Sequence, residues 1–189
     1  MPFSQSSQIS TIIQYIEQLN PTSMLDVGVG MGQYGFLARI NLENINLFEI
    51  NGSQGQQRDK AGWRVKIDGI EGCEVYLTPV HDYTYNKIMW GNALEILPTL
   101  ADNSYELVLA IDILEHLTKE DGMIFVQHLK RIAKHSVLIS TPKEFIPQEV
   151  EANPYENHLS LWTQTELNEL GFHKTLENSI SWVTIFEKN

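Results

Sequence analysis

The stretch LDVGVGMG, from Leu25 to Gly32, decides the fold of this chain. MLDVG, from Met24 to Gly28, predicts a strand, and the residues from about Gln33 to Ile40 predict a helix. Glycines are needed where a backbone turns sharply from strand to helix and approaches a ligand closely. In an open α/β sheet, this turn lies at the carboxyl edge of the strands, where ligands bind. The segment therefore predicts a binding site as well as a fold.

The glycine spacing narrows the choice of ligand. The pattern is acidic-x-Gly-x-Gly-x-Gly, with Asp26, Gly28, Gly30 and Gly32. A dinucleotide fingerprint places its third glycine after a two-residue gap, at the position that Gln33 occupies. No Lys-Ser/Thr pair follows, which excludes a nucleotide P-loop. A tight turn without a ligand is the alternative interpretation.

The composition fits one domain spanning residues 1–189. Hydrophobic residues make up 42% of the chain and charged residues 20%, as in ordinary globular proteins. The net charge of −11 argues against nucleic-acid binding, which uses clustered Lys and Arg. Acidity favours solubility and, weakly, a small-molecule partner. The oligomeric state stays open.

Cys73 is the only cysteine, so an internal disulfide and a Cys-based zinc site are excluded. The stretch MPFSQSSQIS lacks the features of a secretory signal, and no apolar run is long enough to cross a bilayer. These observations predict a cytoplasmic location without membrane association.

Strand-like and helix-like segments alternate along the chain, which predicts an α/β fold with a mostly parallel sheet. The expected helices cover about 8–19, 119–134 and 164–170, and the expected strands about 64–70, 87–90, 105–111 and 136–141. The tail predicts a closing hairpin of two strands. Segments 41–62 and 142–161 show no clear periodicity, and we expect them to act as lids over the site.

Polar residues follow three further predicted strands. Glu71 ends the second strand and can accept hydrogen bonds from ribose hydroxyls; Asp68 is its rival, and a solvated loop acid is the alternative. Asn92 can accept a hydrogen bond from an amine or cap a helix, and Ala93 follows it. Asp112 lies just beyond the long apolar strand.

These four elements, from Leu25 to Leu117, resemble those of class I S-adenosylmethionine-dependent methyltransferases in kind and order. The resemblance implies a Rossmann-like three-layer sandwich: a mostly parallel seven-stranded sheet with a closing antiparallel C-terminal hairpin. It also implies S-adenosyl-L-methionine as cofactor, with S-adenosyl-L-homocysteine as product.

The resemblance assigns roles to individual residues. The turn of Gly28, Gly30 and Gly32 accommodates the methionine end of the cofactor, and Asp26 helps to orient its ammonium group. Glu71 binds the ribose, Asn92 stands where the family commonly has an acid that contacts the adenine amine, Ala93 borders the adenine, and Asp112 lies beside the transferable methyl group.

A second resemblance involves the segment after the fifth strand. STPKE, Ser140 to Glu144, and a His-x-Ser-x-Trp segment resemble a bacterial methyltransferase subgroup of unassigned substrate. The three residues of that segment are His158, Ser160 and Trp162.

Catalytic candidates are Glu115, His116 and His158, beside Asp112. In one interpretation, these four residues bind Mg²⁺, Mn²⁺ or a related divalent ion. This resembles the small-RNA 2′-O-methyltransferases, whose first glutamate is replaced here by Asp112. In a second, a histidine acts as general base or substrate contact without metal. In a third, the residues satisfy hydrogen bonds of loops and helix caps.

Four aromatic residues can shape the acceptor pocket, contact the sulfonium or simply pack: Tyr34, Trp63, Tyr155 and Trp162. The remaining histidines show no converging partners in the sequence and receive little weight: His81, His128, His135 and His173.

The sequence thus predicts methyl transfer to an unidentified acceptor. Its rivals are a noncatalytic S-adenosylmethionine-binding module and a related transferase, for example of aminopropyl groups. An NAD-dependent oxidoreductase is disfavoured by the glycine spacing. A pure interaction domain would not need the four elements in this order.

Overall fold

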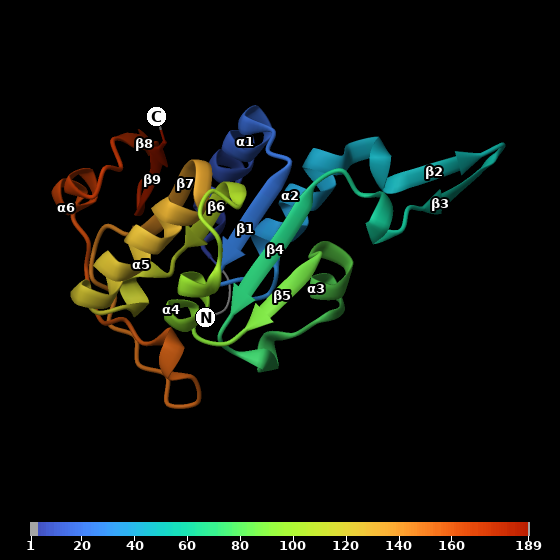
Figure 1. Cartoon of the computed structure of the whole chain (residues 1–189). Helices are drawn as coiled ribbons and strands as arrows, with labels where there is room; N and C mark the ends of the chain where they lie inside the picture. The colour runs from blue at the N-terminus through green and yellow to red at the C-terminus, as the bar shows by residue number, and fades with distance from the viewer. Residues whose placement is uncertain (1–3, 189) are drawn as a thin grey trace.

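The fold is built on a seven-stranded sheet with strand order β5-β4-β1-β6-β7-β9-β8, seen in a computed structural model that describes residues 4–188 (Figure 1). Residues 1–3, the start of the N-terminal stretch considered above, and residue 189 lie outside the described part. Strands β5, β4, β1, β6 and β7 are parallel, whereas β9 is antiparallel to both β7 and β8. The predicted sheet and its closing hairpin are confirmed.

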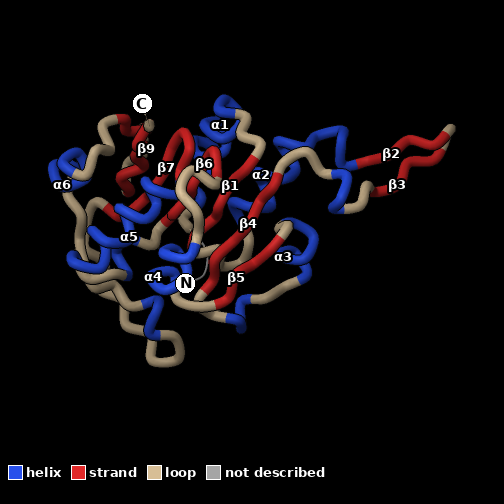
Figure 2. Tube along the Cα trace, viewed as in Figure 1, coloured by secondary structure: helices blue, strands red, loops and turns tan. Residues whose placement is uncertain are grey.

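The strands are β1 (Ser23–Val27), β2 (Phe48–Asn51), β3 (Gln54–Gln57), β4 (Lys66–Glu71), β5 (Lys87–Trp90), β6 (Tyr105–Ile111), β7 (Ala133–Pro142), β8 (Lys174–Leu176) and β9 (Ser181–Glu187). The helices are α1 (Ile9–Leu19), α2 (Gln33–Glu43), α3 (Pro79–Thr84), α4 (Ala93–Ile96), α5 (Lys119–Ile132) and α6 (Gln164–Glu169). Figure 2 shows how these helices flank the sheet.

Both faces of the sheet are covered, which explains its continuous apolar strands. Side chains of a strand alternate between faces. Met24 and Leu107 therefore pack in the core beneath α1 and α2, whereas Leu25 and Val108 pack in the core beneath α5. The three layers follow from this alternation. No helix among the described residues is both long and apolar enough to cross a membrane.

The first helix shows how local chemistry sets its limits. The apolar side chains of Ile12 and Ile16, four residues apart, lie on one face and are fully buried. Asn20 ends the helix in a left-handed conformation (φ 49°), and its N–H donates to the Ile16 carbonyl. Asparagine tolerates this conformation better than most residues.

Segment 41–62 forms a hairpin rather than a cover for the site. Strands β2 and β3 pair only with each other and project from the body of the molecule (Figure 1). The segment connects the end of α2 with the beginning of β4, so it lies at the amino edge of the sheet, opposite the carboxyl edge where ligands bind. The structure therefore does not support a lid at 41–62.

Candidate active site

The glycine-rich turn after β1 is held from two sides. Gly28, Gly30 and Gly32 all adopt positive φ angles, of 79°, 52° and 83°. The Gly30 N–H donates to Oε2 of Glu71 at 2.7 Å, and Nε2 of His81 lies 2.8 Å from the Gly30 carbonyl oxygen. Because a carbonyl only accepts, the His81 nitrogen donates this bond. The turn is fixed in a shape that L-residues rarely adopt.

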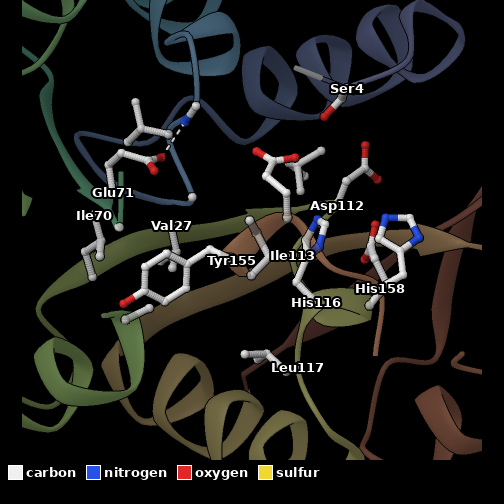
Figure 3. A pocket seen from close by; sticks show the side chains of 18 of the residues that line it. Ser4, Val27, Ile70, Glu71, Asp112, Ile113, His116, Leu117, Tyr155 and His158 are labelled. Carbon is white, nitrogen blue, oxygen red and sulfur yellow. Dashed lines mark hydrogen bonds between the residues drawn. The ribbon is translucent and has the colours of Figure 1, made fainter. Parts of the chain in front are cut away.

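A cavity of about 360 Å³ opens beside this turn, at the carboxyl edge of the parallel strands. Its volume falls within the usual range for small-molecule sites. Nine of the predicted site residues line it: Gly28, Gly30, Glu71, Asn92, Ala93, Asp112, Glu115, His116 and His158. In Figure 3, Glu71 lies at one side of the cavity and His158 at the other.

Asp26 and Gly32 are not among the lining residues. The Asp26 side chain lies within the core, where the Tyr85 hydroxyl donates to its Oδ2 at 2.7 Å. Burial raises the pKa of Asp26 to about 6, and the Tyr85 hydrogen bond opposes this rise. The structure thus places the Asp26 carboxyl group in the core, on the side of the glycine turn away from the cavity lining. Its contact with a cofactor stays a prediction.

Glu71, rather than its rival Asp68, faces the cavity. Its two carboxylate oxygens accept hydrogen bonds from the N–H groups of Gly30 and Cys73, at 2.7 and 2.9 Å. Burial raises the pKa of Glu71, whereas these bonds lower it. Asp68 lies three residues earlier and accepts from the Tyr105 hydroxyl at 2.6 Å, so its carboxylate takes part in packing.

Asn92 caps a helix while lining the cavity. Its Oδ1 accepts the Leu94 N–H at 2.9 Å, at the start of α4. Both uses considered for Asn92 are compatible, since Asn92 itself lines the cavity and its Oδ1 has a second lone pair beside the one used in the cap. The side-chain nitrogen of Asn92 takes no part in the helix cap, so its two N–H groups can also donate hydrogen bonds into the cavity.

Asp112 is fixed in a strained conformation. Its φ of 53° is left-handed, which costs a non-glycine residue about 1 kcal/mol or more. Its Oδ2 accepts from Nε2 of Gln8 at 2.7 Å, and its Oδ1 accepts from the Ser140 hydroxyl. Three separate elements therefore meet at this carboxylate, at the carboxyl end of β6.

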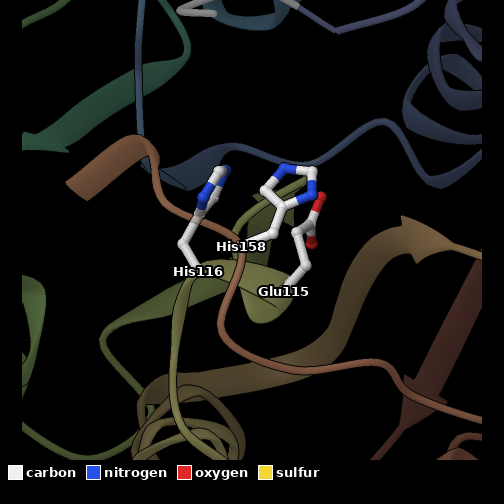
Figure 4. A group of neighbouring side chains, drawn as sticks. All are labelled: Glu115, His116 and His158. Atoms are coloured by element: carbon white, nitrogen blue, oxygen red, sulfur yellow. The ribbon is translucent and has the colours of Figure 1, made fainter. Parts of the chain in front are cut away.

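A cluster of three side chains lies at the side of the cavity opposite Glu71. It consists of Glu115, His116 and His158 (Figure 4). Their potential ligand atoms all lie within 4.8 Å of one another, and the two imidazole rings meet edge to face at 4.8 Å. Burial, with the nearby charge of Asp112, raises the pKa of Glu115 well above its ordinary value. Burial lowers the pKa of His116, which favours its neutral form.

Segment 142–161 covers part of the cavity and is tied to the rest of the chain. The Tyr76 hydroxyl donates to Oε1 of Glu156 at 2.8 Å and accepts from Nδ2 of Asn153 at 2.8 Å. The Tyr155 ring lies against Gly72, where an added Cβ would be 3.3 Å from the ring. This segment contributes lining residues, whereas 41–62 contributes none of those described.

The four aromatic candidates divide into two pairs. Tyr34 and Tyr155 line the cavity. Trp162 is buried, and its Nε1 donates to the Ser160 hydroxyl at 2.9 Å, so it packs the core beside α5. Trp63 contacts the Arg39 guanidinium at 4.0 Å, away from the cavity lining.

Two residues of the site were missed from the sequence. His81 supports the glycine turn, and Gln8 binds Asp112. For His81 a signal existed: Thr78-Pro79 predicts a helix start, and the third helical residue of such a start reaches back to the cap, as His81 does to the Thr78 N–H at 3.0 Å. Gln8 carries no comparable signal, because its partner lies 104 residues away.

No protein-family model matches the chain, and no curated protein matches its sequence. Solved structures do resemble it. A protein from Pyrococcus horikoshii is 14% identical, with a TM-score of 0.63, covering 97% of this chain and 88% of its own. A SAM-dependent methyltransferase from Archaeoglobus fulgidus is also 14% identical, with a TM-score of 0.60, covering 96% of this chain and 91% of its own.

A third similar structure is the magnesium protoporphyrin IX methyltransferase of Synechocystis with bound SAH. It is 14% identical, with a TM-score of 0.63, over 96% of this chain and 82% of its own. At this identity the likeness concerns the fold. The chain has the fold of class I S-adenosylmethionine-dependent methyltransferases, as its sequence predicts.

Proposed function

We propose that this protein binds S-adenosyl-L-methionine and transfers its methyl group to a small-molecule acceptor. The observation that carries the proposal is the acidic lining of the cavity. Four carboxyl side chains line it, those of Glu71, Asp112, Glu115 and Glu156, and no Lys or Arg is among the described lining residues. Such a lining favours a cationic ligand and disfavours the phosphates of a dinucleotide.

The lining residues also fit the shape and polarity of the proposed cofactor. Gly30 leaves its part of the turn without a side chain, and Glu71 offers carboxylate oxygens whose lone pairs exceed the two backbone bonds they accept. Asn92 and Ala93 stand at the next strand end, where an adenine fits between polar and apolar groups. Tyr155 adds an aromatic ring at the Glu71 side of the cavity.

The cofactor supplies a methyl group activated on a positively charged sulfur. The acceptor atom forms the new bond to carbon as the carbon–sulfur bond breaks, and the electron pair of that bond stays on the sulfur. The chain must orient the acceptor and exclude water, as lining segment 142–161 can do. The imidazoles of His116 and His158, on the side opposite Glu71, offer lone pairs to an acceptor proton or a cation.

The acidity of the chain and the size of the cavity, about 360 Å³, support a small-molecule acceptor over RNA. The single cysteine is the basis for proposing a cytoplasmic location. The His158, Ser160 and Trp162 segment is the basis for proposing membership of the bacterial subgroup that it resembles.

Calorimetric titration with S-adenosylmethionine, S-adenosylhomocysteine and NADH tests the cofactor. We expect the first two to bind and NADH not to bind. Glu71→Gln should weaken S-adenosylmethionine binding about 10- to 100-fold, the effect of losing a hydrogen bond to a charged group. Asp68→Asn is the matched control, because it neutralises a buried carboxyl group of the same strand outside the cavity. Binding of NADH alone would refute the proposal.

Turnover separates an enzyme from a noncatalytic binding module. Formation of S-adenosylhomocysteine is measured with pooled small-molecule acceptors, followed by mass identification of the methylated product. His116→Ala and His158→Ala should abolish turnover but spare cofactor binding, whereas His173→Ala, on the exposed surface, should change neither. An aminopropyl transferase would instead use decarboxylated S-adenosylmethionine and release methylthioadenosine. Release of methylthioadenosine in a parallel assay with that donor, without S-adenosylhomocysteine in the first assay, would contradict methyl transfer.

A further inference from the structure

We propose that Glu115, His116 and His158 bind one divalent transition-metal ion at the side of the cavity opposite Glu71. The group lies within the described part of the chain, and its ligand atoms are within 4.8 Å of one another (Figure 4). Glu115 and His116 belong to the short 3₁₀ helix Leu114–His116 after β6, and His158 comes from segment 142–161. Two distant parts of the chain thus converge on one point.

The hydrogen bonds of both imidazoles leave one nitrogen of each available. Nδ1 of His116 lies 3.1 Å from the Asn157 carbonyl oxygen, and Nδ1 of His158 lies 2.6 Å from the Ile146 carbonyl oxygen. A carbonyl oxygen only accepts, so each Nδ1 carries the proton. In the neutral ring, Nε2 then holds the lone pair. Metal-binding histidines are usually oriented by this kind of bond through their other nitrogen.

Glu115 supplies a buried carboxyl group with one oxygen that has no hydrogen-bond partner in the part of the chain that the structure describes. Its side chain is 3% exposed, and its Oε2 makes no hydrogen bond among the described residues. A buried ionised carboxylate is costly, and either protonation or a cation beside it removes that cost. The cavity lining offers no Lys or Arg in its described part to serve as that cation.

Backbone hydrogen bonds hold the two segments that carry the cluster together without any ligand. The N–H groups of Leu159 and Ser160 donate to the Glu115 carbonyl, at 2.8 and 3.1 Å. The Ser160 hydroxyl and Nε1 of Trp162 both lie within hydrogen-bond distance of the Leu114 carbonyl, at 3.3 and 3.2 Å. The segment that carries His158 is therefore positioned against Glu115 before metal binding.

The donor set selects the class of ion. Two imidazoles and one carboxylate suit Mn²⁺, Fe²⁺, Co²⁺ or Zn²⁺, whereas Mg²⁺ and Ca²⁺ prefer oxygen ligands. Ligands of a tetrahedral ion lie roughly 3.4 Å apart for bonds of about 2.1 Å. The most distant ligand atoms, up to 4.8 Å apart, must therefore approach one another by about 1.4 Å, within the reach of side-chain rotation. Asp112 is not in the group of ligand atoms within 4.8 Å of one another, and its two oxygens accept hydrogen bonds from Gln8 and Ser140.

The chemical consequence rests on the proposed function. An ion with three protein ligands keeps open positions, and here these face the cavity. An acceptor hydroxyl at an open position would lose its proton to water more readily. Its oxygen would then form the bond to the methyl carbon as the carbon–sulfur bond of the donor breaks, with the electron pair staying on sulfur. The site therefore points to a hydroxyl-bearing acceptor and to methylation at oxygen.

Calorimetry and the visible spectrum of Co²⁺ test the site without any methyl donor. The full chain is treated with a chelator, dialysed and titrated with Co²⁺, Zn²⁺ and Mn²⁺. We expect one ion per chain and a Co²⁺ absorption spectrum typical of nitrogen and oxygen ligands. Mg²⁺ and Ca²⁺ should bind at least tenfold more weakly. Equal binding of Mg²⁺ and Zn²⁺ would overturn the assignment of imidazole ligands.

Substitution of each ligand tests the residues. Changing residues around a metal site lowers affinity roughly 10- to 100-fold, so Glu115→Gln, His116→Gln and His158→Gln should each lower it at least 100-fold. His173→Gln, at an exposed histidine, is the matched control. Unchanged metal affinity in the ligand variants, or equal loss in His173→Gln, would overturn the proposal.

Binding of S-adenosylmethionine by the same variants shows that they are folded. Measurements on the wild-type chain distinguish a failure of the metal site from a failure of the proposed function. If the wild-type chain binds S-adenosylmethionine but no metal ion, the metal site is refuted and the proposed function stands. If it binds a metal ion but no S-adenosylmethionine, the metal site stands and the proposed function is refuted.

Discussion

Replacing Gly28 by alanine tests why the turn after β1 needs glycine at this position. Gly28 has a φ of 79°, and an added Cβ would lie 2.0 Å from Cδ1 and 2.7 Å from Cγ1 of Ile113. The left-handed conformation costs an L-residue about 1–2 kcal/mol. Because both Ile113 atoms are too close, its side chain must leave its present rotamer, and such overpacking costs about 1–3 kcal/mol. We expect Gly28→Ala to lower the free energy of unfolding by about 2–5 kcal/mol in total.

Gly52 provides a matched control for the conformational part of this cost. Its φ is 66°, and an added Cβ would meet no atom within 4 Å. Gly52→Ala should therefore cost only the first part, about 1–2 kcal/mol. Urea denaturation of both variants gives the difference. The double variant Gly28→Ala, Ile113→Ala should show a favourable coupling energy of at least about 1 kcal/mol, since the clash is absent. Equal losses in Gly28→Ala and Gly52→Ala, or no coupling, would refute the reasoning.

Three further substitutions probe buried groups. The native pKa of Asp26 is about 6, above its ordinary 3.8, so the folded protein keeps a proton that the unfolded protein releases as the pH rises. Asp26 should therefore contribute a fall in stability of about 3 kcal/mol between about pH 3 and pH 7, and Asp26→Asn should reduce the fall measured by urea denaturation by that amount. His81→Gln removes the bond to Gly30 and should weaken S-adenosylmethionine binding about fivefold in calorimetry, from about 1 kcal/mol. Arg39→Met leaves the buried Glu43 without its guanidinium and should lower the free energy of unfolding by about 3–5 kcal/mol.

Each of the three has a control on the surface. Glu17→Gln should keep the pH dependence of the wild type; an undiminished fall in Asp26→Asn would assign the whole fall to other groups. His173→Gln should bind S-adenosylmethionine normally, and normal binding by His81→Gln would contradict a role for His81 in the turn. Arg58→Met breaks a partly exposed ion pair with Glu49 and should cost at most about 1 kcal/mol; a similar cost for Arg39→Met would contradict its burial argument.

Hydrophobic patterns in the sequence predict the sheet well, because a central strand that is buried on both faces is a nearly continuous apolar run. The run from Tyr105 to Ile111 is apolar almost throughout, and it forms β6 with the same limits. Boundaries next to turns are less regular. Helix α5 ends at Ile132, two residues before its expected end, because Ala133 adopts an extended conformation (ψ 135°) and begins β7 directly.

The site was predictable where it depends on strand ends and not where it depends on long-range partners. Glu71 and Asp112 follow strands, so their positions in the cavity lining follow from topology. The contacts of Tyr76 with Glu156 and of Gln8 with Asp112 join residues 80 and 104 positions apart. The hydrophobic periodicity of the sequence does not predict such pairs, because they depend on how loops from separate crossover connections meet in the folded chain.

The projecting hairpin has a practical consequence for protein engineering. Neither core cluster contains a residue of β2 or β3, and the turn at Gly52 and Ser53 is exposed. Exposed loop tips of this kind tolerate inserted domains. A fluorescent reporter placed between these two residues would leave the seven-stranded sheet and both chain ends untouched. The hairpin is therefore the natural point at which to label or immobilise the molecule.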